Sequence, residues 1–185
     1  MAVTPAGTPY VESSDNVADY PGVSLALANH IDGLDGGKVL QVVSVTKVDS
    51  FTTTSTSFVD ITGLTANITP STATSKILVL CKIAINPRLA VAMSQLVRGA
   101  TVIGGGTAAG SRPSAMSTFF PGEGTHTTDI SVNFLDSPAS TSEQTYKIQV
   151  RSNSGTTAVN TSVGDNDDSN QPRLSSTITL MEISA

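Results

Sequence analysis

The sequence predicts an all-β fold: a jelly-roll-like β-sandwich preceded by an extended N-terminal segment with one short helix. From Lys38 onward, short apolar runs alternate with Ser, Thr, Gly and Asn. Aromatic residues make up 4% and charged residues 14% of the 185 residues, so Val, Ile and Leu must fill the core. β-Branched Thr suits strands and Ser suits turns. We therefore expect an N-terminal segment over residues 1–37 and one β-sandwich domain over residues 38–185.

The strands follow from apolar alternation and from the turn residues between the runs. Residues 145–151 alternate most regularly, with Tyr146, Ile148 and Val150 on one face, as in a half-buried strand. Residues 63–70 are expected to form a turn and a short strand. The remaining strands are expected at residues 38–48, 57–61, 76–85, 129–135 and 176–183, with a hairpin of residues 90–99 and 101–106 around Gly99 and Ala100.

The run at residues 76–85 is apolar on both faces. Its odd-numbered residues from Ile77 to Ile85 form one face, and Leu78, Leu80, Lys82 and Ala84 line the other. A strand of this kind is covered on both sides. In a sandwich the second cover is often another subunit, so we expect a homotrimer.

Residues 1–37 differ from the rest of the chain. Their Pro and Gly residues argue for extended or irregular backbone without a strand pattern. A short helix is expected within residues 23–34, with Val23, Leu27 and Ile31 on one face. Such a helix is marginal alone in water, so we expect it to anchor the protein to a partner.

Charge and composition exclude several classes of function. The net charge is −5 and the ten Lys and Arg residues are scattered, which argues against a nucleic-acid partner. No run approaches the ~20 apolar residues of a membrane helix, so no membrane insertion is expected. The single Cys81 excludes an intrachain disulfide framework. The N-terminus lacks a signal-peptide pattern, which indicates a protein made and folded in a cytoplasm.

No catalytic, cofactor-binding or metal-binding residues are predicted. His30 and His126 lack the spacing of a zinc site. Glu123 and Asp129 are two acids in a loop without a defined setting. The acidic loop 165–168 resembles part of a calcium loop but has no Glu at the twelfth position, which favours a solvated loop and leaves cation binding open. The protein is therefore expected not to be an enzyme and to need no cofactor.

Two long stretches lack strand character, residues 104–115 and 154–173, although residues 158–162 could add a short strand. Loops of this length in a compact domain are usually functional or mobile. Both offer many polar groups, and Arg112 and Arg173 add charged donors for carboxylate or phosphate groups. We expect these loops to be the places where the domain contacts a glycan or protein surface.

Several segments resemble virion appendage proteins of tailed bacteriophages, especially marine and cyanobacterial ones. The resemblance rests on residues 37–80, GKVLQVVSVTKVDSFTTTSTSFVDITGLTANITPSTATSKILVL, on residues 136–151, DSPASTSEQTYKIQVR, and on the closing STITLMEI. Residues 8–32 are similar to leader segments that tether a variable C-terminal domain to a phage particle. The resemblance implies a tail fibre or fibre-like appendage, a homotrimer whose jelly-roll head is comparable to tumour-necrosis-factor-like trimers. It implies no catalytic residues.

Three functions are thus open, and all place different demands on the chain. The first is a virion structural protein made in the host cytoplasm, attached to other virion proteins through its N-terminus and contacting the host. The second is a capsid decoration or cement protein, that is, a head fibre. The third and most remote is a small polysaccharide-degrading enzyme, which lacks a defined carboxylate pair or nucleophile.

Overall fold

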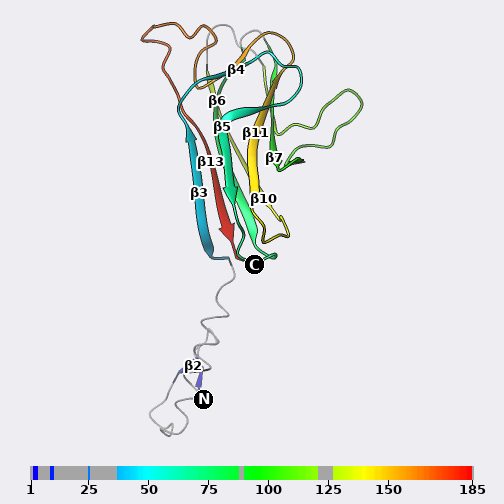
Figure 1. Ribbon diagram of the computed structural model, residues 1–185, viewed down its shortest axis with the longest axis vertical. Coiled ribbons are helices and arrows are strands. Elements are labelled where there is room, and N and C mark those ends of the chain that lie inside the picture. Colours follow the sequence, from blue (N-terminus) through cyan, green and yellow to red (C-terminus); the bar gives the residue numbers. More distant parts are fainter. Residues whose placement is uncertain are drawn as a thin grey trace.

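The structure is a computed structural model and describes residues 37–87, 90–120 and 127–184, together with Leu25 and the backbone of residues 2–3 and 9–10. Two antiparallel sheets pack face to face (Figure 1). The strands of the first sheet are β3 (Val39–Lys47), β4 (Phe51–Thr53), β6 (Lys76–Pro87), β10 (Thr128–Asp136), β12 (Thr157–Val159) and β13 (Ser176–Ile183). The strands of the second sheet are β5 (Val59–Ile68), β7 (Ala92–Arg98), β8 (Thr101–Ile103), β9 (Ser117–Phe119) and β11 (Gln144–Ser152).

The strand order is that of a jelly roll. In the first sheet the order is β3-β13-β6-β10. β12 pairs with β6 on the same side as β13, beyond the start of β13, and β4 pairs with β12 there. In the second sheet the order is β5-β11-β7-β8, with β9 also paired to β7. The long strands alternate between the two sheets along the chain, so each sheet is closed by residues far apart in sequence. The expected all-β, jelly-roll-like sandwich is confirmed.

The core lies between the inward faces of the two sheets and is aliphatic, as the composition required. Each long strand buries every second residue there, because side chains alternate across a strand. Tyr146 is the largest fully buried side chain. The rest of the core includes Ile61, Leu64, Ile68, Ile77, Val79, Ile83, Ile85, Leu96, Ile148, Val150, Ile178 and Leu180. Burying each such side chain contributes about 1.5–3 kcal/mol.

A buried polar cluster joins the two sheets. Asp136, the last residue of β10, is 7% exposed, and its Oδ2 lies 2.5 Å from Arg98 Nη1 of β7. The Tyr146 hydroxyl of β11 donates to the same oxygen at 2.7 Å. Burial, and then the hydrogen bond to Asp136, raises the pKa of Tyr146 above its ordinary value, so the phenol stays protonated and keeps donating.

Two local expectations were wrong. Gly63 does not form a turn between two strands, because β5 is continuous through it. Lys147 pairs with Thr65 and Gln149 with Asp60, so residues 61–64 bulge opposite Ile148, and Gly63 supplies the left-handed φ of +81°. In the N-terminal segment, Ala2–Val3 (β1) pairs with Pro9–Tyr10 (β2), where no strand pattern was expected. Leu25 is helical, but Val23, Leu27 and Ile31 lie outside the described residues.

The sandwich has two distinct ends. At one end Gly37 N donates to Ser184 O at 3.2 Å and Ser184 N donates to Lys38 O at 2.9 Å, so the chain enters beside the end of β13. β3 runs from there to the opposite end, where residues 160–175 and the segment after β3 lie (Figure 1). Gly37 is therefore separated from these loops by the length of β3.

Candidate interaction surfaces

Asn160 fixes the loop at the far end of the sandwich. Its backbone has a left-handed φ of +62°, and its side chain is fully buried. The amide Nδ2 donates to Lys47 O at 2.9 Å and to Asp49 O at 3.0 Å, while Oδ1 accepts from Ser176 Oγ at 2.6 Å. Leu174 N donates to Asn160 O at 3.0 Å, which closes the base of the loop. Residues 161–173 thus project from a rigid base.

The loop is also bonded internally. Arg173 Nη2 lies 2.9 Å from Asp165 Oδ1 and 3.0 Å from Oδ2, and Thr161 Oγ1 donates to Oδ1 at 2.6 Å. Asp168 accepts hydrogen bonds from Asn170, which lower its pKa. Arg173 therefore holds the loop together, and its contact with a receptor stays a prediction. Arg173 pairs with Asp165 at the edge of the acidic loop 165–168. Its positive charge weakens the attraction of this loop for a cation.

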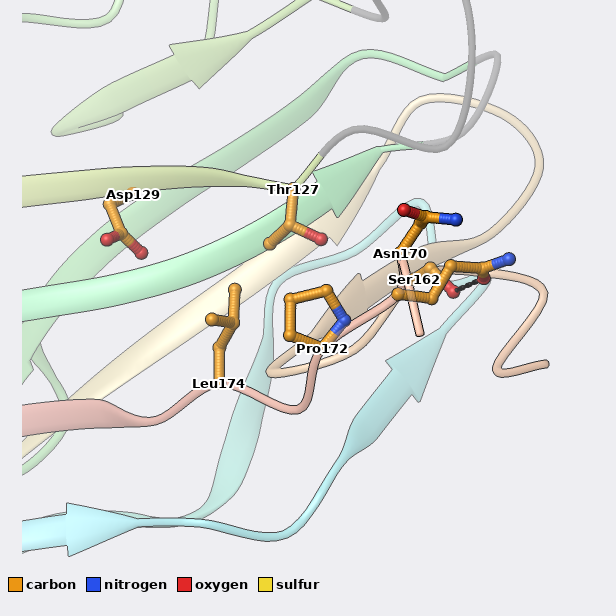
Figure 2. Close-up of a pocket in the computed structure, with 7 residues that line it drawn as sticks. Thr127, Asp129, Ser162, Asn170, Pro172 and Leu174 are labelled. Atoms are coloured by element: carbon orange, nitrogen blue, oxygen red, sulfur yellow. Dashed lines mark hydrogen bonds between the residues drawn. The ribbon is translucent and has the colours of Figure 1, made fainter. Parts of the chain in front are cut away.

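A pocket of about 510 Å³ lies between this loop and the start of β10. Figure 2 shows Thr127 and Asp129 on one side and Pro172 and Leu174 on the other. Ser162, hydrogen-bonded to Gln171, and Asn170 complete the lining. Asp129, the acidic residue among those that line the pocket, is paired with Lys82 at 3.3 Å, so its charge is balanced. The mixed lining suits a neutral polar ligand more than an anion.

Residues 104–115 lie elsewhere, on the flank of the second sheet between β8 and β9. Ala109 and Arg112 exchange backbone hydrogen bonds at 3.1 Å, which makes the stretch a partly ordered hairpin. Gly104 has a φ of +69°, and a Cβ there would come within 2.9 Å of Met116. Arg112 is exposed, and its Nε donates to Ala109 O at 3.2 Å. The two candidate loops therefore present different surfaces.

The other residues singled out from the sequence are only partly placed. Glu123 and His126 lie outside the described residues, so no geometry connects them to Asp129. Within the described part of the chain, no three His, Cys, Asp or Glu side chains gather in a way that could hold a metal ion. Over the same residues, no helix is long and apolar enough to cross a membrane. Sequence reasoning missed the role of Asn160, which stood in the middle of the possible short strand at residues 158–162, whereas β12 (Thr157–Val159) ends just before it.

Comparisons with known proteins add little to this geometry. No protein-family model matches the chain, and no curated protein matches it. Among solved structures, the chain is similar to one described as a structure of infectious bursal disease virus Gx strain, with 12% sequence identity and a TM-score of 0.39. The match covers 79% of this chain and 38% of that chain. A likeness of this size carries no argument about function, so the fold assignment rests on the strand order.

Proposed function

We propose that this protein is a bacteriophage virion structural protein: a tail fibre or fibre-like appendage attached through residues 1–37. In this proposal the far end of the sandwich contacts the host surface, and the appendage is a homotrimer without catalytic activity. The observation that carries the proposal is that the sandwich has two opposite ends with different features. Residue 37 enters at one end, and the anchored loop 161–173 projects at the other. The resemblance of residues 37–80 to phage appendage proteins supports the same assignment.

The arrangement suits recognition by hydrogen bonding. Loops on a rigid β scaffold can vary without disturbing core packing, and so they commonly carry binding. Lys82 and Arg173 are both paired with carboxylates, whereas Asp167 has no ion pair among the described residues. This charge balance favours a neutral or cationic host group at this end, such as an uncharged glycan, over a phosphate-rich one.

Two variants test the proposal in assembled virions. Removing residues 1–37 should leave a folded sandwich that no longer joins particles, measured by mass spectrometry of purified virions. Because Leu174 N already donates to Asn160 O, residues 161–173 can be replaced by a two-residue turn without moving either end. This change should keep the protein on the particle but weaken adsorption to cells.

A matched control shortens residues 137–143, the connection between β10 and β11 at the end where Gly37 enters. This control should adsorb normally. If the variant lacking residues 1–37 is incorporated at normal copy number, the attachment proposal fails. If the 161–173 variant and an equivalent 104–115 variant both adsorb normally, host contact is refuted and a capsid decoration protein becomes the better assignment. Turnover of host polysaccharide by the purified protein would overturn the absence of catalysis.

A further inference from the structure

A row of aliphatic side chains crosses all four main strands on the outward face of the first sheet. Val42 of β3 stands opposite Met181 of β13, Met181 opposite Leu78 of β6, and Leu78 opposite Leu135 of β10. These residues point outward because the alternate residues of each strand form the core. With neighbouring strands ~4.8 Å apart, the row is ~15 Å long.

Three further residues widen the row into a patch: Leu40 and Ile183 on one side and Leu80 on the other. We call these seven residues the outer apolar patch. Within it, Leu40 is 44%, Val42 56%, Leu80 40% and Leu135 51% exposed. Around Leu80 the face is hollowed by about 230 Å³, between short polar side chains that include Thr179 and Asn133. A flat patch with a shallow hollow offers a surface to another macromolecule more than to a small ligand.

The size of the patch fits a contact between two copies. Its seven aliphatic side chains, four of them 40–56% exposed, are comparable to the largest apolar patch of a typical monomer, which is ~300–600 Å². A neighbouring copy that covers the patch would bury this area together with a similar area of its own surface, ~600–1,200 Å² in total, which reaches the ~1,000 Å² expected of a specific interface. Aliphatic sheet faces pack in this way inside sandwiches, ~10 Å apart.

The charges around the patch also fit a second copy. None of the seven residues is charged, and the nearest opposed charges on the same face, Lys82 and Asp129, are paired with each other at 3.3 Å. Lys76 lies at the border and is exposed, so its ammonium group can remain in water. A chain of net charge −5 repels its own copies over most surfaces, but this face brings no unpaired carboxylate into the contact.

We propose that the outer apolar patch is the contact between copies of this chain: around a threefold axis, the patch of each copy is covered by the next copy. This inference deepens the homotrimer of the proposed function by naming its interface. It is tested on purified full-length protein, so its failure is distinct from failure of particle attachment or host adsorption.

The experiment is light scattering coupled to size exclusion, from 1 to 100 µM, on the full chain and on three variants. Leu80→Glu and Leu135→Glu place a carboxylate in the patch. Val102→Glu in β8 is the matched control, because Val102 is 41% exposed on the other sheet and the charge change is the same. Circular dichroism and the melting curve check that each variant is folded.

The wild type and Val102→Glu should both give a mass of three times 19.0 kDa. Each patch variant should associate on the order of a hundredfold more weakly, because the new carboxylate would lose its water in an apolar contact without gaining a partner. A monomeric wild type at 100 µM overturns the proposal. That is also the result expected if the N-terminal segment of the same chain, and not a second copy, covers the patch. Folded patch variants that associate like the wild type also overturn it.

Discussion

Replacing Asn160 should destabilise the sandwich far more than an ordinary loop substitution. Two of the groups that its side chain binds, the Lys47 carbonyl and the Ser176 hydroxyl, belong to buried residues. Ser176 Oγ still accepts from Ala84 N at 3.1 Å, so the main loss is the donor to the Lys47 carbonyl. A buried polar group left without a partner costs about 1–3 kcal/mol, and Asn160→Ala should lose about this much from hydrogen bonding. The left-handed φ of +62° adds about 1 kcal/mol for Ala, which Gly avoids.

The measurement is urea unfolding of four proteins: wild type, Asn160→Ala, Asn160→Gly and Asn166→Ala. Asn166 is exposed in the same loop and serves as the control, which should change stability by less than about 0.5 kcal/mol. Asn160→Gly should keep the hydrogen-bonding loss but not the conformational one. A loss below 1 kcal/mol for Asn160→Ala, or equal losses for Asn160 and Asn166, would refute the argument that this amide anchors the loop.

Three other buried groups give further predictions. Burial alone would raise the pKa of Glu182, but hydrogen bonds from Gln41, Ser75 and Ser71 lower it below its ordinary 4.5. The ionised carboxylate therefore stabilises the fold fully above pH 4.5, and this stabilisation is lost as the pH falls through the pKa of the folded state. Glu182→Gln should make the free energy of unfolding depend less on pH in this acidic range. Tyr146→Phe should cost about 1–3 kcal/mol in urea unfolding, and Asp136→Ala about 3–5 kcal/mol because it strands the Arg98 charge; equal losses would contradict this account of the cluster. Burial raises the pKa of Cys81 to about 12, so iodoacetamide at pH 8 should label it only as the protein unfolds, and rapid labelling of the native state would show that β6 opens locally.

The long strands could be predicted because burial of one face leaves a period-two pattern in the sequence. Residues 145–151 and 176–183 show it plainly, and the structure has β11 and β13 there. Gly63 was misjudged because a glycine that breaks an alternating run looks the same whether it ends a strand or lets it bulge. Only the pairing of β5 with β11 distinguishes the two.

The polar clusters and the patch could not be predicted, because they depend on which strands become neighbours. Arg98, Asp136 and Tyr146 come from three strands, and no local pattern states that their side chains meet. The outward apolar positions of β6 were visible as Leu78 and Leu80, but their alignment with Val42, Met181 and Leu135 exists only once the register is known. The candidate loops were found by composition, whereas the bonds that order residues 161–173 were not.

The position of Gly37 at one end of the sandwich has a mechanical consequence. A particle holding residue 37 and a host holding the opposite end would pull roughly along β3. The hydrogen bonds between antiparallel strands lie across the strand direction, so this pull loads the β3–β13 ladder in shear over its whole paired length, from Ser176 opposite Lys47 to Ile183 opposite Val39. Many bonds must then fail together, whereas a pull across the sheet would open them one after another. The direction in which the chain enters the sandwich thus suits it to carry tension.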